Sequence, residues 1–300
     1  MSRTMSDGFS LIKIGGDIAK PATELIKKVA DGIGGGFRPR QIRRVAQAQA
    51  DAEVIKAKSH IEISELQQRA VVRWISEESK KQDNIESITE KAIGQLNASS
   101  TPQDIENDWI ANFFDKCRII SDEEMQLLWS KILAGESNSP GTFSKRTVNS
   151  LGSLDKKDAQ LFNALCGFTC SIGDDLIPFI FHTPGPVPID LSIYNNNKMN
   201  FIALAHLSSI GLITFEAVGY YQDELKQQVD ISYFDTTVRV EFKNPADNKL
   251  DNGNVLLTNV GKELAKVCNS KPIDGFVDLL IDLFSKMGLV VSSLYPRQNM

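Results

Sequence analysis

One stretch of this chain constrains its fold more than any other. Between Arg40 and Ile93 there is neither proline nor glycine, and the segment is rich in Ala, Gln, Glu, Lys and Arg. It predicts a single helix from about Arg38 to Leu96, on the order of 80 Å long at about 1.5 Å per residue. Helices in compact domains average about three turns. A rod of this length usually needs a partner, so the segment favours assembly over catalysis.

The predicted rod carries an apolar stripe at spacings near three, four and seven residues. It comprises Ile42, Val45, Ala52, Ile55, Ile63, Leu66, Ala70 and Trp74. The members that we expect oligomerisation to bury are Val45, Ala52, Ile55, Ile63, Leu66 and Trp74. Gln49 and Ser59 interrupt the stripe, so packing against the same chain or in a loose bundle competes with a two-stranded coiled coil.

The densest basic cluster lies at the start of the rod and contains Arg38, Arg40, Arg43 and Arg44. Four arginines could hold phosphate groups. A solvated or inter-subunit charge patch is the other interpretation, since no aromatic residues are interleaved with them. The net charge of -5 argues against extensive nucleic-acid coating.

Residues 1–37 form a glycine-punctuated segment with an amphipathic pattern around Pro21, which suits the first turn of a short helix. Its apolar face comprises Ile14, Ile18, Leu25, Ile26 and Val29. Lysines flank this face, but acidic residues offset most of their charge. The face is therefore predicted to dock on protein, with contact to a membrane surface as the alternative.

Residues 98–173 read as a helical core after the predicted rod of residues 38–97. Thr101 precedes Pro102 as a helix start would, and Ser121 with Glu124 fits a capping box. Two aromatic helices containing Trp109 and Trp129 are expected to pack as a hairpin. The last helix of this segment is predicted to run from Asp155 to Ile172.

Residues 174–300 differ in composition from the helical segment before them. They contain more prolines and several segments rich in residues that favour β-strands. The order of helix, strand, hairpin, strand and helix predicts a winged-helix-like element. The chain is therefore expected to be mainly α, with a long N-terminal helix, a helical core and a small α+β C-terminal domain. The helix near Lys262 and Lys266 is poor in residues that read base edges, which favours protein docking over DNA binding.

Little in the sequence indicates chemistry. Cys166 and Cys170 would lie on one face of the predicted helix, but a zinc site needs about four ligands and buried structural thiols are the simpler interpretation. The three histidines, His60, His182 and His206, have no paired spacing. We expect a protein that is not an enzyme, with no catalytic, metal or cofactor residues and no cofactor. The absence of a signal peptide or membrane span predicts a cytoplasmic protein, with a peripheral position on the inner membrane left open.

Four segments resemble a bacterial family catalogued as a domain of unknown function, number 2806. They are RPRQIRRVAQAQADAEVIKAKSHIEISELQQRA, DWIANFFDKCRIISDEEMQLLWSKILAGE, PGTFSKRTVNSLGSLDKKDAQLF, and LSSIGLI followed by LLTNVGKELAKVC. The resemblance implies no catalytic residues. The order of an amphipathic start, a helical middle and LTxxGxxL is also similar to the abortive-infection alpha family, which would imply a role in phage defence.

These features together predict a bacterial, non-enzymatic homo-oligomer that serves as an interaction or scaffold protein and binds a protein partner. Two alternatives stay open. One is a nucleic-acid-binding protein that uses Arg38 to Arg44 and the winged element. The other is a membrane-active effector that acts through residues 9–37.

Overall fold

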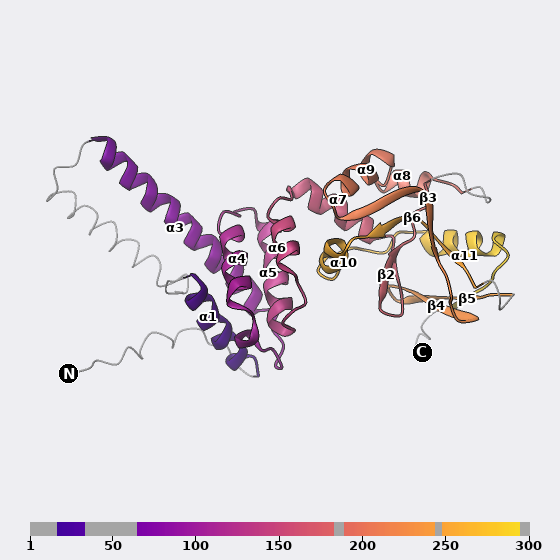
Figure 1. The fold of residues 1–300 in the computed structure, drawn as a ribbon, viewed down its shortest axis with the longest axis horizontal. Helices are drawn as coiled ribbons and strands as arrows, with labels where there is room; N and C mark the ends of the chain where they lie inside the picture. The colour runs from indigo at the N-terminus through magenta and orange to yellow at the C-terminus, as the bar shows by residue number, and fades with distance from the viewer. Residues whose placement is uncertain (1–16, 34–64, 183–188, 244–247, 295–300) are drawn as a thin grey trace. The chain divides into compact units, whose positions relative to one another are not determined.

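The structure is a computed structural model that describes residues 17–33, 65–182, 189–243 and 248–294 (Figure 1). The chain divides into two compact units, Met1–Ser153 and Leu154–Met300. We describe each unit by itself.

The described part of the N-terminal unit is helical. Its elements are α1 (Ala19–Ile33), α3 (Glu65–Ile93), the 3-10 turn η1 (Pro102–Asp104), α4 (Asn107–Cys117), α5 (Glu123–Asn138) and α6 (Lys145–Leu151). The helix α3 packs along α5, α4 packs on α6, and α1 lies against α4 and η1. The predicted rod is therefore helical over Glu65–Ile93, and its earlier part, residues 38–64, lies outside the described residues.

Aromatic rings fill the space between α4 and α5, as expected for the predicted hairpin. Phe113 stacks on Trp109 and meets Trp129 edge-on, with ring centroids 5.1 Å apart in both pairs. All three side chains are buried. Because aromatic residues bury more apolar surface than most side chains, this cluster anchors the unit.

Two predicted helix starts are displaced. The cap of α5 is Asp122 rather than Ser121, and its Oδ1 accepts a hydrogen bond from the Met125 amide at 3.1 Å. Thr101 precedes only a 3-10 turn, because Ile105 and Glu106 are extended and delay α4 until Asn107. At the start of α6 the Ser144 hydroxyl is the cap and accepts a hydrogen bond from the Thr147 amide.

The C-terminal unit combines helices with two antiparallel sheets. Its helices are α7 (Lys156–Cys166), α8 (Ser192–Asn196), α9 (Phe201–Ser209), α10 (Asn259–Ala265) and α11 (Phe276–Lys286). Its strands are β1 (Thr169–Ile172), β2 (Asp175–Pro178), β3 (Ile213–Gln222), β4 (Gln228–Tyr233), β5 (Thr236–Glu241), β6 (Leu250–Leu257) and β7 (Val290–Leu294). The strand order is β2-β1-β4-β5-β7 in the larger sheet, while β3 and β6 form a separate pair.

The core of this unit lies between the larger sheet and α11. Alternate residues of β4 are buried, which is the period-two pattern of a strand with one covered face. Phe276 of α11 contacts Tyr233 and Phe168, with ring centroids 5.0 and 5.2 Å apart. Phe284, two turns along α11, meets Phe179.

The predicted fold class is wrong. The C-terminal unit spans Leu154–Met300 and carries all seven strands of the described residues, so it is not a small appendage to a mainly helical protein. The hairpin β4–β5 is not the wing of a winged helix either. It lies inside the five-stranded sheet, between β1 and β7, while the strands that flank it in sequence, β3 and β6, pair with each other in a separate sheet.

The helix predicted over Asp155–Ile172 is also too long. It ends at Cys166, and Cys170 lies in β1. A Cβ on Gly167 would meet the Lys271 carbonyl at 3.1 Å, so a distant backbone segment presses on the chain where the helix ends. Cys166 and Cys170 therefore do not share a helix face.

Candidate functional site

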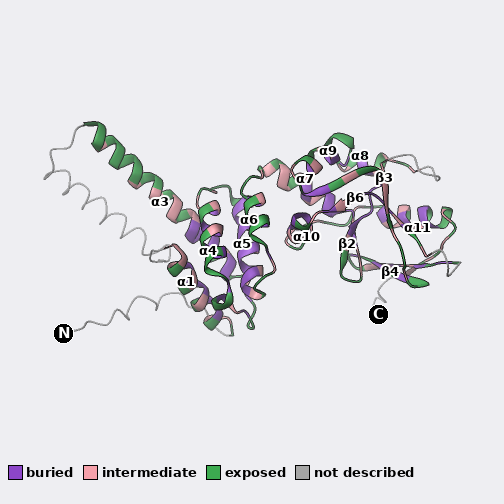
Figure 2. Cartoon of the chain, in the orientation of Figure 1, coloured by how far each residue is buried: buried purple, intermediate pink, exposed green. Residues whose placement is uncertain are grey.

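The most distinctive surface of the N-terminal unit is the first half of α3. Leu66 is 68% exposed and Trp74 is 63% exposed, and Ala70 between them is exposed too. Figure 2 shows this half of α3 in green and the second half mostly buried. We call Leu66, Ala70 and Trp74 the α3 stripe. Single exposed apolar residues are common, but three at four-residue spacing form a continuous surface.

The α3 stripe lies on the same side of the helix as apolar residues that are buried farther along it. Ala70 precedes Ile88, and Trp74 precedes Ala92, by 18 residues, which is about five turns. Ile88 and Ala92 are fully buried where α3 packs in the core. Glu77 and Lys81 lie on the same side of α3, between these two apolar stretches, and the described residues cover only the second stretch.

A polar seam fixes α3 against α5. Gln126 Oε1 accepts hydrogen bonds from Ser87 Oγ at 2.9 Å and from Lys91 Nζ at 2.6 Å. Gln126 Nε2 donates to Asn84 Oδ1 and to the Ile120 carbonyl. These bonds set the register of the two helices, because a shift of one residue would separate the donors from their acceptors.

The rim of the α3 stripe carries charges of both signs. Ion pairs join Glu65 to Arg69 at 3.6 Å and Arg73 to Glu77 at 3.5 Å. Exposed pairs of this kind contribute a few tenths of a kcal/mol each to helix stability. Their main effect is to balance the charge beside the stripe.

The remaining predicted assembly residues, Val45, Ala52, Ile55 and Ile63, lie outside the described residues. The same holds for Arg38, Arg40, Arg43 and Arg44, and for Ile14.

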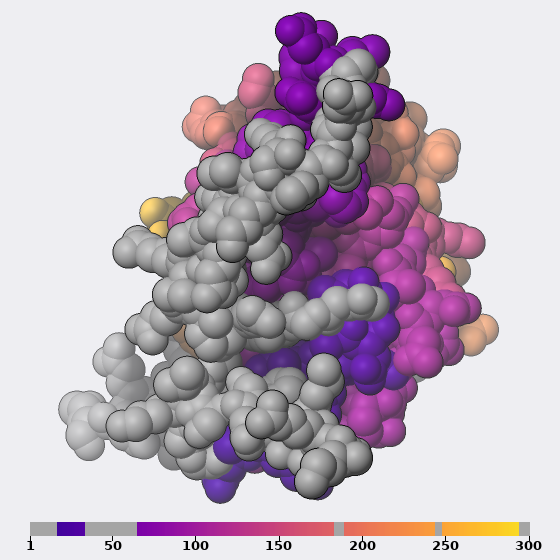
Figure 3. All heavy atoms as spheres, turned by 90° about the vertical axis from the view of Figure 1, so that its left-hand side faces the viewer, coloured from indigo at the N-terminus to yellow at the C-terminus, as the bar shows by residue number. Residues whose placement is uncertain are grey.

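The predicted docking face of α1 is buried within its own unit. Leu25 and Val29 are fully buried and Ile26 is nearly so, while Ile18 is half-buried. Figure 3 shows α1, in indigo, lying against the magenta helices of the unit. Lys28 Nζ adds a polar contact to this packing, donating to Asn107 Oδ1 at 2.7 Å. No helix of the described residues combines the length and apolar character needed to cross a membrane.

Two titratable side chains of the C-terminal unit, Tyr233 and His206, form contacts that join separate elements of the fold. Burial raises the pKa of Tyr233 to about 12, and its hydroxyl donates to the Gly167 carbonyl at 2.8 Å and accepts from the Ile273 amide at 2.6 Å. His206 Nε2 lies 2.7 Å from Asp158 Oδ1, which joins α9 to α7. Within the described ranges, no three His, Cys, Asp or Glu side chains gather as metal ligands would.

Comparison with known proteins identifies one match. Residues 68–281 match the model of a family described as a protein of unknown function (DUF2806). The chain belongs to this family. No curated protein and no solved structure matches the chain, so the likeness to the abortive-infection family is not supported.

The DUF2806 region begins inside α3 and ends inside α11, so it includes Trp74 but not Leu66. Three of the four segments that carried the resemblance lie within it. The first, residues 38–70, lies almost wholly before it.

The last of those DUF2806 segments is explained by packing. Thr258 caps α10 by accepting from the Gly261 amide, and its hydroxyl donates to the Gly211 carbonyl at 2.7 Å. A Cβ on Gly261 would overlap the Leu212 carbonyl oxygen. One contact therefore joins the segments LSSIGLI and LTNVGKEL. It needs Thr258 as the hydrogen-bond donor to Gly211, and it needs Gly261 because a side chain there would overlap Leu212.

Sequence reasoning missed two structural clusters of the DUF2806 region. The buried Glu136 carboxylate accepts from the Gly141 amide at 2.6 Å and the Phe143 amide at 2.8 Å, while the Trp109 indole donates to the Phe143 carbonyl. Asn254 binds the backbone of Ile180 at 2.7 Å and of His182 at 2.7 Å. The sequence signals for these clusters were the glycines of SPGTF, beside the Glu136 cluster, and of DNGN, beside Asn254. Glycine is frequent where the backbone turns.

Proposed function

We propose that the protein is a non-enzymatic interaction protein that self-associates through the α3 stripe. The observation that carries this proposal is that Ala70 and Trp74 are exposed on the side of α3 on which Ile88 and Ala92, about five turns later, are buried. A second copy of the chain would cover this face in the way that α5 covers the rest.

The free energy gained by burying the α3 stripe, compared with the cost of association, indicates how tight the complex should be. Burial of Leu66 or Trp74 contributes about 2–3 kcal/mol per side chain. Two copies bring four such side chains, against an association cost of about 4–15 kcal/mol. The α3 stripe by itself therefore supports weak pairing. Val45, Ala52, Ile55 and Ile63, predicted to continue it, would be needed for a tight complex.

The charges on α3 favour a copy of the same chain as the partner. From Glu65 to Lys81 the helix bears four cations and three anions, although the whole chain has a net charge of -5. A surface of nearly balanced charge can face itself without net repulsion. An acidic surface could not.

Light scattering over a range of protein concentrations tests the proposal. We expect the wild-type chain to be an oligomer and Trp74→Glu and Leu66→Glu to shift it toward the monomer, because each places a charge in the apolar contact. Val72→Glu is the matched control. Val72 is 46% exposed on the same helix and lies two residues, or about 200°, from both Ala70 and Trp74.

The control should keep the wild-type mass. A monomeric wild-type chain at every concentration would refute self-association. Equal dissociation by Val72→Glu and Trp74→Glu would show that the α3 stripe is not the interface.

The two alternatives draw no support from the described residues. Lipid binding through α1 would have to displace its packed face from α4, and the winged element invoked for nucleic-acid binding is not formed. A role in phage defence stays a prediction that a phage-plating assay of expressing cells, with Trp74→Glu as the comparison, would test.

A further inference from the structure

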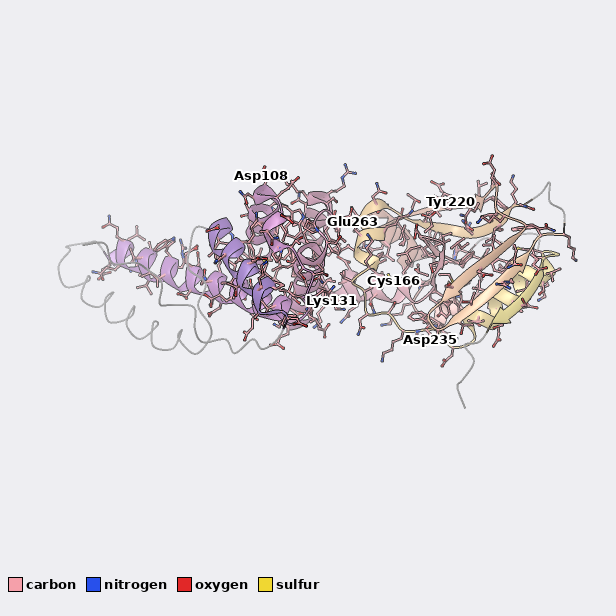
Figure 4. The ribbon with its side chains drawn as sticks, turned by 90° about the horizontal axis from the view of Figure 1, so that it is seen from below. Asp108, Lys131, Cys166, Tyr220, Asp235 and Glu263 are labelled. Carbon is pink, nitrogen blue, oxygen red and sulfur yellow. The ribbon has the colours of Figure 1, made fainter. Side chains whose placement is uncertain are left out.

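Two thiols that are far apart in the sequence meet in the C-terminal unit. Cys166 is the last residue of α7, and Cys268 follows α10. The two thiol side chains interact with each other. Figure 4 labels Cys166 among the elements of this unit.

A second contact holds the same two segments together. The Asn269 amide donates to Asn163 Oδ1 at 2.9 Å, so the residue after Cys268 is tied to α7 about one turn before Cys166. A Cβ on Gly167, the residue after Cys166, would lie 3.1 Å from the Lys271 carbonyl oxygen, so the backbone that follows Cys268 packs against the end of α7. The thiols therefore meet because the segments are held together.

A cavity gives small molecules access to one member of this pair. A surface cavity of about 210 Å³ has Cys166 in its wall, together with Cys170, Thr169, Ser232, Phe234 and Ser270. A water molecule occupies about 30 Å³ in the liquid, so the cavity admits a hydroperoxide. Cys166 is 5% exposed, whereas Cys268 is half-buried and is the more accessible thiol. Interaction with the Cys268 side chain, together with burial, raises the pKa of Cys166, which keeps that thiol protonated at neutral pH.

We propose that Cys166 and Cys268 are a redox modification site that forms a reversible disulfide, with hydrogen peroxide as the oxidant. The Cys268 sulfur attacks one peroxide oxygen, the O–O bond breaks, and water leaves with the thiol proton. The Cys166 sulfur then attacks the Cys268 sulfenic acid. The S–O bond breaks, and the hydroxide leaves as water with the Cys166 proton. Two thiols lose two electrons in total, and one peroxide becomes two waters.

This site is independent of self-association through α3. The disulfide would join the end of α7 to the segment between α10 and α11 and close a loop of about 100 residues. Such a link constrains the unfolded chain, so oxidation should raise the unfolding temperature of the C-terminal unit. A dithiol reductant would reverse the change.

Thiol mapping of the full chain tests the proposal. The protein is treated with hydrogen peroxide, denatured, alkylated with iodoacetamide and analysed by intact mass and peptide mapping. We expect two of the four cysteines to resist alkylation, a peptide pair linked through Cys166 and Cys268, and recovery of all four thiols after dithiothreitol. Cys170→Ser should behave as wild type, whereas Cys166→Ser and Cys268→Ser should lose the protection.

The Cys166→Ser variant also tests the order of the steps. Dimedone, which traps sulfenic acids, should label Cys268 in this variant. The proposal is overturned if the wild-type map shows four alkylated cysteines or a bond to Cys170 instead. The wild-type map decides the question even if a serine variant does not fold.

Discussion

Gly261 lies on the first turn of α10, where another backbone segment leaves no room for a side chain. The Leu212 carbonyl oxygen occupies the space that a Cβ would take. We expect Gly261→Ala to destabilise the C-terminal unit by about 2 kcal/mol, because the overlap forces backbone movement, although alanine is the better helix former. Urea unfolding followed by circular dichroism measures the change.

Gly94→Ala is the matched control for that substitution. The nearest atom to a Cβ on Gly94 is the Lys91 carbonyl oxygen at 3.7 Å, an ordinary contact. Its free energy of unfolding should stay within about 1 kcal/mol of wild type. An equal loss in both variants would mean that the Leu212 carbonyl is not the cause.

At the scale of elements, the polar seam makes α3 and α5 depend on each other. Gln126→Ala removes the acceptor of the buried Ser87 Oγ and one of the two acceptors of Lys91 Nζ, the other being Ser87 Oγ. We expect a loss of about 2 kcal/mol in the free energy of unfolding of the N-terminal unit, since an unsatisfied buried polar group costs about 1–3 kcal/mol. Chemical denaturation followed by tryptophan fluorescence would report it.

A triple variant separates hydrogen bonding from packing at the seam. Gln126→Leu combined with Lys91→Met and Ser87→Ala replaces the three side chains that meet at Gln126 Oε1 with apolar groups, and leaves Asn84 and the Ile120 carbonyl in place. Its stability should be closer to wild type than that of Gln126→Ala. If the triple variant loses at least as much stability, packing rather than polar satisfaction accounts for the seam.

Local patterns predicted the elements better than their pairing. The first helix of the order predicted for residues 174–300 forms as α9, and the hairpin of β4 and β5 also forms. The neighbours of that hairpin are β1, about 60 residues before it, and β7, about 50 residues after it. No local pattern encodes these partners. The end of α7 was missed for the same reason, because Lys271, which presses on Gly167, is remote in sequence.

The candidate sites differ in the same way: local spacing predicted one of them, and the other depends on residues that are remote in sequence. Helical spacing alone placed Leu66, Ala70 and Trp74 on one face of α3. The thiol pair could not be found in this way, since 102 positions separate Cys166 from Cys268. Cys170, which spacing favoured as the neighbour of Cys166 on a helix, lies in a strand.

At the scale of the whole molecule, the division at Ser153 and Leu154 predicts two unfolding events. Gln126→Ala should lower the midpoint of one transition and Gly261→Ala that of the other, because each residue packs within its own unit. The double variant should show both shifts unchanged, as expected for distant sites that share no partner. Differential scanning calorimetry of the four proteins would resolve the transitions. A single transition that both substitutions shift would show instead that the two units unfold as one cooperative body.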